Sequence, residues 1–149
     1  MRLAVSGKGG VGKTTIAGTL CRLIGRSGRP VLALDADSNP NLAVSLGLPH
    51  QPSEQITAVP TDLAEWRTYD DGKAYVHLTM PFAQVEQEYG VAVADNVTLL
   101  LMGQVNHAGV GCRCSAHASA RGLMDHLWQA DAPVIVTDME AGLEHLGRG

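Results

Sequence analysis

Residues 7–15, Gly7-Lys8-Gly9-Gly10-Val11-Gly12-Lys13-Thr14-Thr15, carry the pattern that decides the expected fold. They contain the motif G-x-x-x-x-G-K-[ST], whose glycines let backbone amides turn inward around phosphate oxygens. The apolar segment Leu3-Ala4-Val5 before the motif is typical of a short buried strand, and apolar positions after it recur at helical spacing, at Ile16, Leu20, Leu23 and Ile24. A strand, a glycine-rich loop and a helix in this order predict a βαβ unit, and therefore an α/β fold with a mostly parallel sheet flanked by helices.

The polar residues of this loop have expected partners on a nucleotide. We expect Lys13 to reach the β- and γ-phosphates and the Thr14 hydroxyl to bind Mg²⁺, while the N-terminus of the following helix favours an anion. The alternative is an ordinary glycine-rich turn between a strand and a helix. The complete motif in its expected setting favours a nucleotide-binding loop, whose members are Gly7, Lys8, Gly9, Gly10, Val11, Gly12, Lys13, Thr14 and Thr15.

Further strands and helices are expected along the chain. Apolar runs predict strands at residues 31–34, 74–78, 97–102 and 134–137. The first helix is expected to end near Gly25 and Gly28, before Pro30. Asn39 and Pro40 are typical of an N-cap and a first helical position, so a short helix is expected to follow them. Two more helices are expected at residues 61–67 and, capped by Ser115, at residues 116–127.

Length, charge and cysteine content limit the class of protein. The 149 residues predict a single nucleotide-binding domain, 1–149. A net charge of -4 and an aromatic content of 4% disfavour a nucleic-acid partner. The longest apolar runs are far below the ~20 residues that a membrane span needs, and the start of the chain does not resemble a signal peptide. Three cysteines without an export signal indicate free thiols and a cytoplasmic location.

Acidic residues follow the predicted strands at 31–34 and 134–137. Asp35, Asp37 and Asp138 are expected at the carboxyl ends of parallel strands, where ligands of such sheets bind. One carboxylate there can hold a water molecule bound to Mg²⁺, and another can orient the water that attacks a phosphate. Either Asp37 or Asp138 could instead cap a helix, and Asp35 is the more ambiguous member of the first pair.

The loop contains one more lysine, Lys8, which makes the similarity to a known family more specific. Gly-Lys-Gly-Gly-Val-Gly-Lys-Thr-Thr resembles the deviant Walker A loop of the MinD/ParA/nitrogenase iron protein superfamily, whose fold is that of the P-loop NTPases. The resemblance implies that Lys8 reaches the phosphates of a partner in a homodimer; a solvated surface lysine is the alternative. It also implies that Asp37 orients the attacking water, that Asp138 is the Walker B aspartate and that the Gly142 amide senses the γ-phosphate. The expected catalytic residues are Lys8, Lys13, Asp37 and Asp138.

A pair of cysteines, Cys112 and Cys114, flanks Arg113, which could lower the pKa values of both thiols. Two sulfurs do not complete a tetrahedral metal site, but two chains related by a twofold axis would supply four thiolates. Such a site accepts Ni²⁺ or Zn²⁺. A redox thiol pair and a Cys₂His₂ site that includes His107 or His117 remain open, whereas Cys21 is expected to be a small buried residue.

The segments around this pair, Gly111-Cys112-Arg113-Cys114-Ser115-Ala116-His117-Ala118 and Glu140-Ala141-Gly142-Leu143-Glu144-His145-Leu146, resemble the CooC-type ATPases. The resemblance implies ATP hydrolysis, metal held by a C-x-C pair at a dimer interface, and nickel insertion into carbon monoxide dehydrogenase as the client. The family's sheet continues through further strands, so the chain is expected to be its N-terminal part. The alternatives are a ParA- or MinD-like positioning ATPase and a non-catalytic fragment that retains only phosphate binding.

Overall fold

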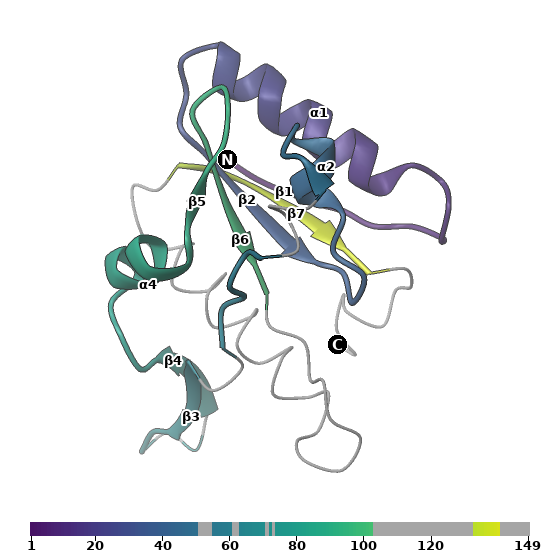
Figure 1. Ribbon diagram of the computed structural model, residues 1–149. Helices are drawn as coiled ribbons and strands as arrows, with labels where there is room; N and C mark the ends of the chain where they lie inside the picture. Colours follow the sequence, from purple (N-terminus) through teal and green to yellow (C-terminus); the bar gives the residue numbers. More distant parts are fainter. Residues whose placement is uncertain (51–54, 61–62, 71, 73, 103–132, 141–149) are drawn as a thin grey trace.

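The computed structural model describes residues 1–50, 55–60, 63–70, 72, 74–102 and 133–140 (Figure 1). No helix among them is long and apolar enough to cross a membrane.

A five-stranded sheet forms the centre of the described structure. Its strands are β1 (Arg2–Val5), β2 (Val31–Ala36), β5 (Val91–Ala92), β6 (Val97–Leu101) and β7 (Val134–Met139), in the spatial order β1-β7-β2-β6-β5. All neighbouring pairs are parallel except β5 and β6, which are antiparallel. The strands expected near the N-terminus and at 31–34, 97–102 and 134–137 are thus confirmed, and so is the mostly parallel α/β fold.

Helices cover the two faces of this sheet, as Figure 1 shows. On one face, Ala17 and Cys21 of α1 (Lys13–Arg26) and the buried residues of α2 (Leu42–Ser45) pack on Val31 and Ala33 of β2. On the other face, Val85 of α4 (Phe82–Tyr89) belongs to the apolar cluster of Leu32 and Leu34. Successive residues of a strand point to opposite faces, so the apolar run of β2 supplies both clusters.

The helix expected at residues 61–67 is wrong. That segment contains β3 (Ala64–Thr68), which pairs antiparallel with β4 (Ala74–Leu78), so the strand expected at 74–78 is confirmed. The pairing places Glu65 opposite His77 and Arg67 opposite Tyr75. The strand is stabilised by this partner about ten residues away, and a local search for helical spacing could not detect it. Neither α4 nor β5 was expected from the sequence.

The start of α2 also differs from the expectation. Asn41 occupies the N-cap, not Asn39, and its side chain makes no capping hydrogen bond. The backbone N–H of Leu42 instead donates to Oδ2 of Asp35 at 2.9 Å. A buried carboxylate from the preceding strand therefore satisfies the helix terminus, which removes the need for a local cap.

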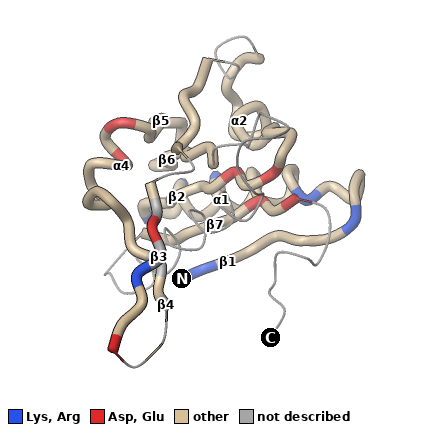
Figure 2. The backbone as a smooth tube through the Cα atoms, turned by 90° about the horizontal axis from the view of Figure 1, so that it is seen from below, with Lys and Arg blue, Asp and Glu red and all other residues tan. Residues whose placement is uncertain are grey.

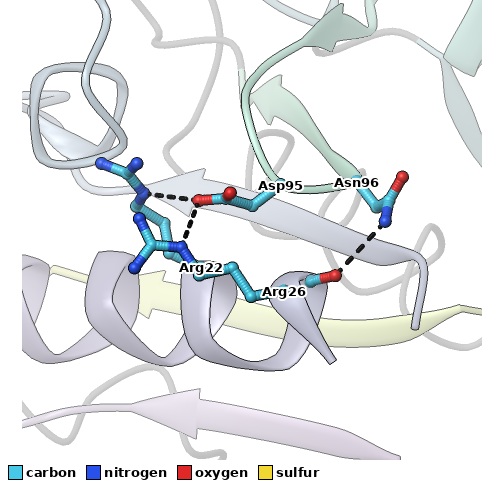
Figure 3. Close-up of polar contacts among 5 residues, drawn as sticks. Arg22, Arg26, Asp95 and Asn96 are labelled. Carbon is cyan, nitrogen blue, oxygen red and sulfur yellow. Dashed lines mark hydrogen bonds and ion pairs between the residues drawn. The ribbon is translucent and has the colours of Figure 1, made fainter. Parts of the chain in front are cut away.

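The C-terminal half of α1 packs closely on the turn between β5 and β6 (Figure 3). Arg22 Nε and Arg26 Nε donate to Asp95 Oδ2 at 2.9 Å and 3.1 Å, and Asn96 Nδ2 donates to the carbonyl of Gly25 at 3.3 Å. The two arginines lower the pKa of Asp95 through these hydrogen bonds and their charges. A Cβ atom at position 25 would lie only 1.7 Å from the Asp95 carbonyl oxygen, so this contact requires glycine.

Candidate functional site

Three neighbouring strands bring the candidate site together through their register. Val5, the last residue of β1, is paired with Asp138 of β7, and Asp138 is paired with Asp35 of β2. The nucleotide-binding loop follows β1 directly, so it begins beside Asp138 at the carboxyl edge of the sheet. Ligands of parallel α/β sheets bind at this edge.

The loop has the backbone that its glycines predict. Gly10 and Gly12 have φ values of 77° and 89°, in the left-handed region that glycine adopts without strain. Gly12 is the N-cap of α1, and its carbonyl accepts the N–H of Ile16 at 2.9 Å. Lys13 follows with only 7% of its surface exposed, and its Nζ donates to the carbonyl of Lys8 at 3.3 Å. The Lys8 residue itself is exposed.

Asp138 is the most unusual polar residue of the site. It is 0% exposed, and neither carboxylate oxygen has a hydrogen-bond partner within the described part of the chain. Burial raises the pKa of Asp138. The Thr14 hydroxyl lies close enough to lower this pKa, although it does not form a hydrogen bond of good geometry with the carboxylate. The charge of Asp37 raises the pKa further, and the charge of Lys13 lowers it. A buried carboxylate without partners is costly, and a cation or water molecule carried by a cation would satisfy it. The residues therefore fit a Mg²⁺ site made by Thr14 and Asp138.

Asp35 lies beside Asp138 but has a different environment. It is 1% exposed, and its two oxygens accept the backbone N–H groups of Asp37 at 3.2 Å and Leu42 at 2.9 Å. The pKa of Asp35 is raised to about 6, and burial is the main cause. The charges of Asp138 and Asp37 add to the increase, whereas the two hydrogen bonds oppose it. Asp35, whose role the sequence left open, thus accepts two backbone hydrogen bonds that hold the loop after β2.

Asp37 begins this loop and is half-buried. Its Oδ1 accepts the N–H of Asn39 at 2.9 Å, a short Asx turn. It is close enough to both Asp35 and Asp138 for its charge to raise their pKa values. The structure thus brings Lys13, Thr14 and Asp37 close to Asp138.

One further contact at this edge was not expected from the sequence. Ser38 Oγ donates to Oε1 of Glu140 at 2.8 Å and links the loop after β2 to the end of β7. In Figure 2, several acidic positions, coloured red, lie near the labels of α1, β2 and β7, so acidic residues gather in this region. Ser38 and Glu140 are 102 positions apart in the sequence, so no local signal could predict their contact.

The remaining predicted site residues lie outside the described part of the chain. They are Cys112, Cys114, Gly142 and the alternative ligands His107 and His117. Within the described part, no group of three or more His, Cys, Asp or Glu side chains is arranged to hold a metal ion. Cys21 is a buried free thiol, and burial raises its pKa to about 12, so the expectation of a small buried residue is confirmed.

Comparisons with known proteins found a family model and several similar sequences. A family model described as the CobQ/CobB/MinD/ParA nucleotide binding domain matches residues 3–124. The chain is 41% identical over 153 residues to the carbon monoxide dehydrogenase accessory protein CooC of Rhodospirillum rubrum, a match that covers 100% of this chain and 58% of that protein. It is 39% identical to an uncharacterised ATP-binding protein of Methanocaldococcus jannaschii, covering 99% of this chain and 58% of that protein. The chain thus spans less than two thirds of the length of these curated relatives.

Among solved structures, a plasmid partition protein from Borrelia burgdorferi aligns with a TM-score of 0.47 and 15% sequence identity. The alignment covers 93% of this chain and 54% of that protein.

Proposed function

The chain belongs to the CobQ/CobB/MinD/ParA nucleotide-binding domain family, and from this premise we propose that it binds ATP with Mg²⁺ and hydrolyses the γ-phosphate. The observation that carries the proposal is Asp138, which is fully buried and unpartnered among the described residues, beside the loop that ends in Lys13 and Thr14. Buried carboxylates without partners are rare in proteins, and they are typical of sites where a ligand compensates the burial. The similarity to an ATP-binding protein that is 39% identical supports ATP as the nucleotide.

Each residue of the site has a different role in the proposed phosphoryl transfer. Lys13, whose ammonium group donates to a loop carbonyl in this structure, is the group that exchanges this contact for phosphate oxygens. Thr14 and Asp138 would hold Mg²⁺, which would neutralise charge on the phosphates. Asp37 orients the water for in-line attack, because it is the half-buried carboxylate next to Asp138.

Phosphate release tests this proposal. The chain and its Lys13→Ala variant are incubated with ATP and Mg²⁺, and both are checked for folding by far-ultraviolet circular dichroism. We expect turnover from the chain and background release from the variant. Equal release from two folded proteins would exclude hydrolysis at this site and leave the non-catalytic alternative.

A second part of the proposal concerns metal. We propose that the chain serves nickel insertion into carbon monoxide dehydrogenase, in the cytoplasm, as a homodimer that holds Ni²⁺ or Zn²⁺ between two Cys112 and Cys114 pairs. The similarity to the accessory protein CooC supports the client. Lys8 is exposed, so it is available to a second chain, as the proposed dimer requires.

Native mass spectrometry with ATP and Ni²⁺, added separately and together, tests the metal proposal. We expect one metal ion per dimer, lost when Cys112 and Cys114 are both replaced by serine, with ATP binding intact. Cys21→Ser is the matched control, because the Cys21 thiol is buried with a pKa of about 12 and should leave nickel binding unchanged. Full nickel binding by the double variant would contradict the site. ATP-dependent binding to liposomes or DNA that survives loss of both cysteines would indicate a positioning ATPase instead.

A further inference from the structure

The loop after β2 is held mainly by side-chain acceptors. The N–H of Asp37 donates to Asp35 Oδ1, the N–H of Asn39 to Asp37 Oδ1, and the N–H of Leu42 to Asp35 Oδ2. These bonds fix the fold of the loop and tie both of its ends to Asp35. They do not connect the loop to β7, the strand that carries Asp138.

The pairing between β2 and β7 stops just before the loop. Its last pairs are Asp35 with Asp138 and Ala36 with Met139. Asp37 therefore lies beyond the ladder, and its position relative to Asp138 depends on contacts other than backbone pairing. The hydrogen bond from Ser38 Oγ to Glu140 Oε1 is such a contact, since Ser38 follows Asp37 directly and Glu140 lies two residues after Asp138.

We propose that Ser38 and Glu140 form a positioning pair, which continues the β2–β7 pairing with side chains and holds Asp37 at its working position relative to Asp138. This inference rests on the proposed ATP hydrolysis, in which Asp37 orients the attacking water. Neither residue touches the phosphates in this role. Their effect passes through the backbone of Asp37, on one side, and through the end of β7, on the other.

The chemistry of the pair sets the size of the expected effect. A hydroxyl that donates to a carboxylate makes a charge-assisted bond, but this one is exposed and competes with water. A contribution typical of single hydrogen bonds corresponds to a change of about 3- to 10-fold in rate. Water orientation is sensitive to small displacements, so the loss should fall on kcat and leave the KM for ATP unchanged.

Paired substitutions test the assignment. Ser38→Ala and Glu140→Ala remove the bond, and both should lower kcat about 3- to 10-fold at unchanged KM. Ser38→Thr keeps the hydroxyl and Glu140→Gln keeps the acceptor oxygen, so both should retain the activity of the unmodified chain. The double variant Ser38→Ala/Glu140→Ala should lose less activity than the product of the two single losses predicts, because both changes break the same bond. Equal losses for the conservative and the alanine variants would overturn the inference.

Hydrogen–deuterium exchange without nucleotide supplies a readout that does not depend on hydrolysis. Loss of the pair should speed the exchange of the amides of Asp37, Asn39 and Leu42 in the two alanine variants and leave it unchanged in the two conservative ones. If the unmodified chain shows no hydrolysis that depends on Lys13, the proposed function fails, and exchange still tests the pair. Unchanged exchange in Ser38→Ala would overturn the inference even where the ATPase activity is confirmed.

Discussion

Replacement of Gly25 by alanine tests how tightly α1 is packed on the turn before β6. Alanine is the better helix former, and in an exposed helix this exchange would stabilise the protein by about 1 kcal/mol. At position 25, however, the new Cβ atom would lie 1.7 Å from the carbonyl oxygen and 2.9 Å from the carbonyl carbon of Asp95. The obstacle is backbone, so no rotation of a side chain can remove it.

The geometry gives the sign and the size of the effect. An ordinary contact begins at 3.4 Å, so helix and turn must separate by an amount comparable to the 1.7 Å shortfall, 3.4 Å minus 1.7 Å. Such a displacement also stretches the hydrogen bond from Asn96 Nδ2 to the Gly25 carbonyl. Overpacking of this kind costs up to about 3 kcal/mol. After subtraction of the helix preference, we expect Gly25→Ala to lower the free energy of unfolding by about 2 kcal/mol.

Urea unfolding followed by circular dichroism measures this change as a shift in midpoint at constant slope. Gly18→Ala is a graded control, because its Cβ would lie 2.9 Å from Ser45 Cβ, and it should cost less than Gly25→Ala. Thr19→Ala, at an exposed position of the same helix, should have little effect. A Gly25→Ala variant as stable as the unmodified chain would refute the close packing of α1 on Asp95.

Two more predictions concern the buried aspartates. The folded-state pKa of Asp35, about 6, lies above its ordinary 3.8, so its stabilising contribution is complete below pH ~4 and is lost as the pH rises through 6, by about 3 kcal/mol. The unfolding free energy of the unmodified chain minus that of Asp35→Asn, from urea titrations, should therefore fall by about this amount between pH 4 and 7, and a flat difference would contradict the burial of Asp35. Asp138→Asn removes a buried charge without partners in the described structure, so at pH 7 it should raise the free energy of unfolding by about 1–3 kcal/mol while weakening the Mg²⁺ dependence of ATP binding. A lower free energy of unfolding for Asp138→Asn, measured in the same titrations, would contradict the burial of Asp138 without hydrogen-bond partners.

The parts of the fold that local patterns specify were predictable from the sequence. The nucleotide-binding loop, α1 and the buried strands follow from one motif and from apolar runs that both faces of a parallel sheet require. Strand β4 was expected, but its partner β3 was missed, because the stability of β3 comes from pairing between Glu65 and His77 and their neighbours and not from its own period.

The sequence indicated which residues lie at the site better than it indicated the role of each residue. Asp35 and Asp37 are the same residue type two positions apart, and only the structure shows that Asp35 accepts two backbone amides while Asp37 begins the loop. The cap expected from Asn39 was wrong for the same reason, since Asp35 supplies the acceptor from another element. The single domain 1–149 and the roles of Lys8, Gly142, Cys112 and Cys114 stay predictions.

Calorimetric titration with ATP and Mg²⁺ tests the central claim most directly, that the loop ending in Lys13 and Thr14 forms a nucleotide site with Asp138. The account predicts saturable binding of one nucleotide per chain. Binding should be lost in Lys13→Ala, which removes the ammonium group that now donates to the Lys8 carbonyl. Equal affinity of the unmodified chain and a folded Lys13→Ala variant would contradict the account.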